Sequence, residues 1–186
     1  MFDHFDLLAP IYDRVIRAGE IETFVEMLDL PSPGILLDAG GGTGRISSHL
    51  DGLVEGVVVT DRSLGMLKKA ADKTGLSATQ SVSEQLPFNH AAFSRILVVD
   101  SLHHFRDQQR AMAEMLRVLE PGGRLVIKEP NLHRWQVKLI ALLEKLTLMR
   151  SRFCYPTEIC RMAQSLGAFG SVVAQDPFMA WIIVNK

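Results

Sequence analysis

Residues 35–44 of this chain read ILLDAGGGTG, a short apolar run that ends in an acid and then in four glycines. The apolar residues predict a buried strand, and a strand that turns through glycines into the next element exposes backbone N–H groups at the turn. Glycine has no Cβ, so a ligand can approach this backbone closely. A glycine cluster alone is equally compatible with a tight turn that binds nothing, so the rest of the chain decides its role.

After this turn the chain alternates short apolar runs with amphipathic stretches, which is typical of an α/β fold. The amphipathic stretches predict helices from about 20 to 28, over 43–50, after an N-cap at Ser63 and after an N-cap at Asp107. The apolar runs predict strands at 35–37, 57–60, 78–82, 96–99 and 125–127. Such alternation implies a mostly parallel sheet with helices on both faces.

The last third of the chain predicts two further helices and a closing hairpin. Apolar residues spaced four and three apart over 133–149 indicate one helix, and a second helix spans 156–166. Strands at 171–175 and 179–184 are separated by a connection too short for a crossover, so they pair antiparallel. We therefore predict a doubly wound, Rossmann-like, mostly parallel sheet of seven strands that ends in an antiparallel hairpin.

Composition excludes several classes of protein. The 186 residues fit a single domain, and 20 basic against 21 acidic residues give no electrostatic reason to expect nucleic-acid binding. Cys154 and Cys160 have neither redox nor zinc spacing, so we expect reduced thiols and no metal site. The acidic start lacks the basic segment of a signal peptide, and no apolar run reaches the roughly 20 residues of a membrane span. We expect a soluble, cytoplasmic protein.

Polar residues follow several of the predicted strands directly, at the carboxyl edge where doubly wound sheets bind ligands. They are the glycine turn, Asp61, Ser83–Glu84 and Asp100. Asp61 can accept two hydrogen bonds from the hydroxyls of an adenosine ribose, and the alternative is a solvated acid in a turn. Both nicotinamide dinucleotides and S-adenosylmethionine contain such a ribose. Arg45 stands where the third glycine of a dinucleotide-binding GxGxxG would fall, which disfavours the nicotinamide reading.

Four stretches, in order, resemble the motifs of the class I S-adenosylmethionine-dependent methyltransferases. They are LDAGGGTG at 37–44, TDRS at 60–63 with the following ML at 66–67, SEQLPF at 83–88 and LEPGGRL at 119–125. Within the class, Phe5–Asp6 and Tyr12–Asp13 are similar to the quinone-biosynthesis C-methyltransferases and related small-molecule enzymes. The resemblance implies S-adenosylmethionine as the cofactor, a small-molecule methyl acceptor, and one methyltransferase domain over 1–186. It also implies that 1–30 and 131–160 are lid or acceptor-side elements.

The resemblance also implies roles for individual residues. Asp38, Thr43 and the glycine backbone would hold the amino-acid end of the cofactor, Asp61 its ribose, and Arg62 would flank its adenine. Val82 and Ser83 would line the adenine pocket, and Asp100 would lie near the amino group or the sulfonium. The expected cofactor-binding residues are Asp38, Gly40, Gly42, Thr43, Gly44, Asp61, Arg62, Val82, Ser83 and Asp100.

A general base is needed only if the acceptor must lose a proton. His104 and His103 follow the fourth predicted strand and are the candidates, because imidazole titrates near neutral pH. The alternative for each is a packed or surface histidine in a loop. Glu129, after the fifth strand, is a weaker polar candidate.

Other readings remain open at this stage. They are a nicotinamide-dependent oxidoreductase and a non-catalytic, S-adenosylmethionine-binding regulatory module. The basic segment 133–152 reads as a lid helix with solvated charges, and the alternatives are an apolar acceptor pocket or contact with a membrane surface. Nucleic-acid methylation is disfavoured, because the chain after the fourth strand reads DSLH and not the Asp-Pro-Pro-Tyr type of motif.

Overall fold

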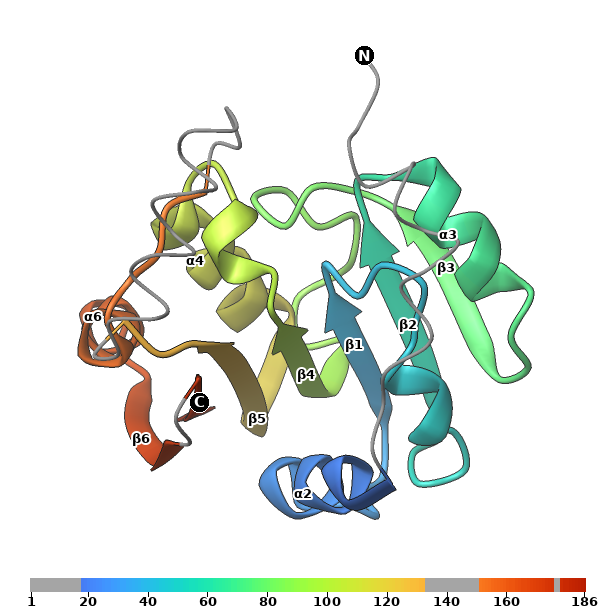
Figure 1. Ribbon diagram of the computed structural model, residues 1–186, viewed down its shortest axis with the longest axis horizontal. Coiled ribbons are helices and arrows are strands. Elements are labelled where there is room, and N and C mark those ends of the chain that lie inside the picture. The colour runs from blue at the N-terminus through green and yellow to red at the C-terminus, as the bar shows by residue number, and fades with distance from the viewer. Residues whose placement is uncertain (1–17, 133–150, 176–177) are drawn as a thin grey trace.

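The computed structural model describes residues 18–132, 151–175 and 178–186, and its centre is one seven-stranded sheet (Figure 1). The strands are β1 Ile35–Ala39, β2 Gly56–Asp61, β3 Leu76–Gln80, β4 Phe93–Val99, β5 Leu119–Pro130, β6 Phe169–Gln175 and β7 Met179–Asn185. The α-helices are α2 Ala18–Leu28, α3 Leu64–Ala71, α4 Gln108–Val118 and α6 Pro156–Ser165. Two single 3-10 turns are η2 Ser47–His49 and η3 Leu102–His104.

The strand order is β3-β2-β1-β4-β5-β7-β6. The first five strands along this order are parallel, and β7 pairs antiparallel with both β5 and β6. The predicted fold class, including the antiparallel hairpin at the end, is confirmed. Because β1, β2 and β4 run the same way, their carboxyl ends meet at one edge of the sheet (Figure 1).

Side chains alternate between the two faces of the sheet and make two large cores, beside a small third cluster of Val59, Leu67 and Ala70. Leu36, Leu97 and Val126 pack on one face with Phe24 of α2, and all four are fully buried. Their neighbours in sequence point to the other face, where α4 and α6 contribute buried residues to the larger core. Helix α2 is anchored further by an ion pair between Glu20 and Lys128.

Two helix starts confirm the capping predictions. The Ser63 hydroxyl accepts a hydrogen bond from the N–H of Met66 at 3.1 Å, and α3 begins at the next residue. The Asp107 carboxylate accepts one from the N–H of Arg110 at 3.0 Å at the start of α4. Both caps satisfy N–H groups that have no partner inside the first helical turn.

The helix expected over 43–50 does not form, and this prediction is wrong. The segment is a series of turns followed by the short η2. Gly44 has φ +66°, outside the helical region, and a Cβ there would stand 2.4 Å from a methyl group of Leu76. The close packing of β3 on this turn therefore favours an irregular backbone. The third strand also begins two residues earlier than predicted, at Leu76.

Two predicted features lie outside the described residues: the part of the predicted lid element 1–30 up to residue 17, and the helix over 133–149. Within the described ranges, no helix is long and apolar enough to cross a membrane.

Candidate active site at the carboxyl edge of the sheet

A cleft of about 490 Å³ lies at the carboxyl edge of the sheet. Four segments line it: the glycine turn, the end of β2, the loop after β3 and the loop after β4. The residues expected from the sequence that line it are Asp38, Gly40, Gly42, Thr43, Asp61, Arg62, Val82, Ser83, Asp100 and His104. Gly44 and His103 do not line it. A cleft of this size is in the usual range for a small-molecule site.

The glycine turn folds directly over the carboxyl group of Asp38. The N–H groups of Gly40 and Gly41 both donate to the carbonyl of Thr60, at 2.8 and 3.1 Å, so the turn is tied to the end of β2. A Cβ on Gly41 would stand 2.3 Å from the carboxyl carbon of Asp38, and one on Gly40 would stand 2.8 Å from the hydroxyl of Ser101. Side chains are therefore excluded here, and the backbone itself forms the wall of the cleft.

Asp38 is a buried acid at the floor of this cleft, 2% exposed. Burial raises the pKa of its carboxyl group to about 7. The nearby Ser47 hydroxyl lowers this pKa, the negative charge of Asp61 raises it further, and the positive charge of Arg45 lowers it. A carboxyl group in this position has a strong tendency to pair with a cationic group that enters the cleft. It fits the ammonium of an amino-acid ligand.

Asp61 connects the end of β2 to the glycine turn. Its Oδ2 accepts a hydrogen bond from the N–H of Gly42 at 2.9 Å, and its Oδ1 accepts one from the N–H of Ser63 at 2.8 Å. A carboxylate has about four acceptor sites, so both oxygens can accept further hydrogen bonds from a ligand in the cleft. The sequence correctly placed this acid at the strand end, but it did not reveal that the same acid shapes the turn.

The loop after β3 is tied to the start of α4 by Glu84. Its Oε1 accepts hydrogen bonds from the N–H groups of Arg106 and Asp107, at 2.7 and 3.2 Å. Its backbone carbonyl accepts one from Nε of Arg110 at 3.0 Å. This side chain fixes the wall of the cleft that Val82 and Ser83 line.

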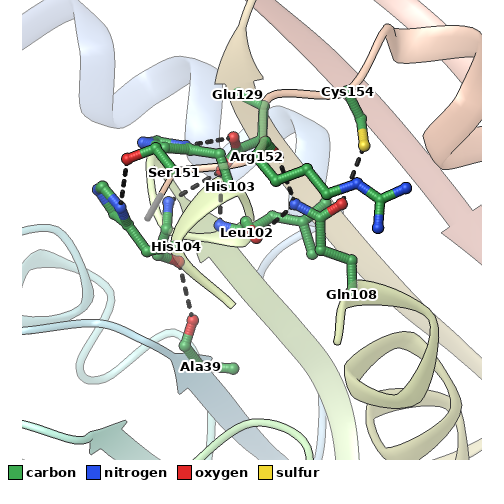
Figure 2. Close-up of polar contacts among 10 residues, drawn as sticks. Ala39, Leu102, His103, His104, Gln108, Glu129, Ser151, Arg152 and Cys154 are labelled. Atoms are coloured by element: carbon green, nitrogen blue, oxygen red, sulfur yellow. Dashed lines mark hydrogen bonds and ion pairs between the residues drawn. The ribbon is translucent and has the colours of Figure 1, made fainter. Parts of the chain in front are cut away.

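The loop after β4 is held by Glu129, which is 4% exposed (Figure 2). One carboxylate oxygen accepts hydrogen bonds from the N–H groups of Ser101 and Leu102, each at 2.8 Å. The other lies 2.7 Å from Nδ1 of His103. The Ser101 hydroxyl donates to the carbonyl of Ala39 at 3.2 Å, which joins this loop to the glycine turn. Glu129 thus acts on the cleft through the backbone that it holds.

The two adjacent histidines have different surroundings. His103 is 3% exposed, bonded to Glu129 and stacked on Phe153 with ring centroids 4.4 Å apart, so its ring lies in the protein interior. His104 lines the cleft, and its Nδ1 lies 3.2 Å from the hydroxyl of Ser151. Of the two candidates for a general base, only His104 has access to a ligand in the cleft.

Residues 151–154, which we call the strap, pack against the loop after β4 (Figure 2). The N–H of Arg152 donates to the carbonyl of His103 at 2.7 Å. The buried amide of Gln108 donates to the carbonyls of Leu102 and Arg152, at 3.0 and 2.6 Å, and accepts a hydrogen bond from the thiol of Cys154 at 2.9 Å. Burial, assisted by Glu158, raises the pKa of this thiol, so it keeps the proton that it donates. Sequence reasoning missed the strap, because its partners lie more than 40 residues away.

Residues 37–127 match a family model described as a methyltransferase domain. The demethylmenaquinone methyltransferase of Thermobifida fusca is 33% identical over 138 residues, which cover 67% of this chain and 58% of that protein. The ubiquinone/menaquinone biosynthesis C-methyltransferase UbiE of Saccharophagus degradans is 36% identical over 135 residues, 67% of this chain and 54% of that protein. The chain thus spans a little more than half the length of the curated relatives it matches.

Solved structures share the fold at low sequence identity. A SAM-dependent methyltransferase from Aquifex aeolicus aligns over 100% of this chain and 99% of its own, with a TM-score of 0.79 and 15% identity. The [4+2]-cyclase SpnF aligns over 98% of this chain and 93% of its own, with a TM-score of 0.76 and 17% identity. These likenesses show the fold alone, and the activity has to be argued from the site.

Proposed function

Because residues 37–127 match a methyltransferase domain and the curated relatives are methyltransferases, we propose that this chain transfers the methyl group of S-adenosylmethionine to a small-molecule acceptor. The main support for the proposal is that Asp38, the backbone of the glycine turn and Asp61 lie together at one edge of the sheet. S-adenosylmethionine supplies an electrophilic methyl group on a sulfonium, so the protein has mainly to align the partners and exclude water.

The residues of the cleft fit this cofactor. The carboxyl group of Asp38, buried beneath the glycine turn, pairs with the ammonium of the amino-acid end. Asp61 accepts hydrogen bonds from the ribose hydroxyls while it keeps those from the turn. Arg62, Val82 and Ser83 surround the adenine. The same proposal assigns the remaining contacts to the backbone of Gly40 and Gly42, to Thr43 and to Asp100, which line the cleft. Gly44 does not line the cleft, so its proposed role is to shape the turn.

We further propose one methyltransferase domain over 1–186, in which 131–160 contributes to the acceptor side. Support comes from Ser151, whose hydroxyl contacts His104 at the edge of the cleft. The described part of the other proposed segment, α2, packs in the core and does not line the cleft. We propose a cytoplasmic location, because Cys154 and Cys160 are both free thiols.

Isothermal calorimetry with S-adenosylmethionine tests the proposal. We expect binding to the wild type and a loss of about 100-fold in affinity for Asp61→Ala, since two hydrogen bonds to a charged group disappear. Asp72→Ala, which removes an exposed acid at the end of α3, is the matched control and should bind normally. The absence of heat from the wild type would refute the proposal.

A panel of small acceptors separates catalysis from simple binding. Release of S-adenosylhomocysteine with at least one acceptor is expected for a methyltransferase. Tight binding with no turnover on any acceptor would favour the regulatory module.

A further inference from the structure

We propose that Glu84 is a positioning residue for the proposed reaction: it couples the binding of the adenosine end of the cofactor to the loop after β4, and so sets the ring of Phe105 against the glycine turn. This inference rests on the proposed function, and it adds the residue that connects two walls of the cleft. It starts from the carboxylate of Glu84, which belongs to one wall and binds the backbone of the other.

The loop after β4 is held by a carboxylate at each of its two ends. Near its start, one oxygen of Glu129 accepts hydrogen bonds from two consecutive N–H groups. At its end, Oε1 of Glu84 accepts hydrogen bonds from the N–H groups of Arg106 and Asp107, at 2.7 and 3.2 Å. Phe105 lies between these two attachments and lines the cleft. The position of its ring therefore depends on both carboxylates.

The two ends of the loop differ in burial. Glu129 is 4% exposed, and the buried amide of Gln108 binds a carbonyl of the same loop nearby. Glu84 is half-buried, and Arg106 and Asp107 are both exposed. Hydrogen bonds of the backbone that are in contact with water open more readily than buried ones. We therefore expect the loop to open at the end that Glu84 holds.

Glu84 itself lies on the wall of the cleft that we assign to the adenine. The loop after β3 leaves the edge strand of the sheet and reaches α4 (Figure 1). Residues 81–85 of this loop line the cleft, and Val82 and Ser83 directly precede Glu84. A ligand that contacts these two neighbours restricts the backbone on which the carboxylate stands. Occupation of the adenosine end should therefore stabilise the bonds of Glu84 to the loop after β4.

The base of the loop after β3 is fixed separately, by side chains in the middle of α4. Oε2 of Glu114 accepts a hydrogen bond from the N–H of Leu86 at 2.9 Å. Arg117 donates to the carbonyls of Phe88 and Leu86, at 2.9 and 3.0 Å. The loop thus has one anchor at its base and another at Glu84, and the two can be removed independently.

The other end of the coupling is the contact of Phe105 with the glycine turn. A Cβ on Gly40 would stand 3.2 Å from a ring carbon of Phe105, so the ring packs directly on the backbone of the turn. Phe105 immediately precedes Arg106, whose N–H is bound by Glu84. When that bond opens, the ring loses the constraint that keeps it on the turn. Because such coupling is reciprocal, a loop that is held closed also raises the affinity for the cofactor.

Exchange of the backbone amide hydrogens tests the coupling. It is measured by NMR in the full chain, with and without saturating S-adenosylhomocysteine. In the wild type we expect this ligand to slow exchange of the Arg106 and Asp107 amides by about 10-fold. In Glu84→Ala the effect of the ligand on these amides should fall below about 2-fold. Glu84→Gln keeps an oxygen acceptor and should restore most of it. If Glu84 had a structural role alone, its removal would speed exchange equally with and without the ligand.

The matched control is Glu114→Ala, which loosens the base of the same loop and leaves the contact of Glu84 in place. It should keep the ligand effect of the wild type at Arg106 and Asp107. An equal loss in Glu114→Ala would overturn the inference. So would a wild type in which the bound ligand has no effect on these amides, or a full effect in Glu84→Ala.

The ¹⁹F NMR signal of 4-fluorophenylalanine at Phe105, assigned by its loss in Phe105→Leu, tests the far end of the coupling. With S-adenosylhomocysteine bound we expect one signal in the wild type and a second, from the released ring, in Glu84→Ala. Identical spectra would overturn the assignment of Phe105. Calorimetry separates the two failures. If S-adenosylmethionine and S-adenosylhomocysteine do not bind the wild type, the proposed function fails, and if they bind while the amides do not respond, only this inference fails.

Discussion

The glycine turn after β1 and the loop after β4 line the same cleft, but different interactions hold them in shape. The turn is fixed by its backbone: Gly40 and Gly41 donate to one carbonyl, and neither has room for a Cβ. The loop is fixed by side chains, above all by the carboxylate of Glu129 and the amide of Gln108. The turn should therefore be sensitive to added atoms, and the loop to removed ones.

We expect the largest loss of stability when the carboxylate of Glu129, which holds the loop after β4, is removed. Glu129→Ala leaves two buried N–H groups and His103 without their acceptor, so we expect the free energy of unfolding to fall by about 4 kcal/mol. Urea unfolding measures this as a lower midpoint at unchanged slope. Glu55→Ala, at an exposed position before β2, is the control. Equal stability of the two variants would show that side chains do not hold the loop.

The second prediction concerns the pH dependence that Asp38 confers on stability. Because the pKa of Asp38 is raised to about 7 in the folded state, the fold keeps a proton that the unfolded chain releases above about pH 4. The free energy of unfolding therefore falls as the pH rises toward 7 and then levels off. Between pH 5 and pH 8 we expect a loss of about 3 kcal/mol from this group.

Asp38→Asn is neutral at every pH and should lack this decline. The measurement is the free energy of unfolding of both proteins at pH 5 and pH 8. The stability of the variant relative to the wild type should increase as the pH rises. Parallel curves would contradict the prediction.

The third prediction adds one methyl group to the turn. In Gly41→Ala the new Cβ would stand 2.3 Å from the carboxyl carbon of Asp38, so that group must move. Overpacking of this kind costs about 1–3 kcal/mol. A cost of this size on the cofactor-bound turn lowers the affinity for S-adenosylmethionine by about 5- to 150-fold. Gly56→Ala is the matched control, since nothing lies within 4 Å of its added Cβ. Similar affinities of Gly41→Ala and Gly56→Ala in calorimetry would contradict the claim that the glycine turn is sensitive to added atoms.

We expect the smallest effect from Cys154, which contacts the loop after β4 through Gln108. Cys154→Ala removes a thiol that donates to Gln108, but Gln108 keeps its two bonds to backbone carbonyls. A thiol is a weak donor, so we expect a loss below about 1 kcal/mol and unchanged cofactor affinity. Thermal unfolding and calorimetry measure the two quantities. A loss of stability as large as that for Glu129→Ala would show that the strap, and not Glu129, contributes most to holding the loop after β4.

The same contrast explains what the sequence predicted. The caps at Ser63 and Asp107 and the acid at the end of β2 depend on neighbours a few residues away, and they could be inferred directly. The helix over 43–50 failed because Leu76, on another strand, packs against Gly44. No local pattern records such a contact.

The roles of the side chains around the loop were harder to infer for the same reason. Glu129 was a weak candidate for chemistry, and its part in holding the loop depends on partners 26 to 28 residues away. The contact between His104 and Ser151 joins residues 47 apart. The roles of the individual cofactor-binding residues stay predictions until a ligand is bound.

The position of β7 between β5 and β6 has a consequence for synthesis on the ribosome. β6 is synthesised before β7, which is its strand partner in the described sheet. β6 therefore cannot pair until β7 has been synthesised. Until then the edge of β5 also lacks a partner. At roughly 5–20 residues per second, translation from 131 to 185 leaves this edge open for about 3–11 s. During that interval a nascent chain with a complete glycine turn still presents an unpaired strand to its neighbours.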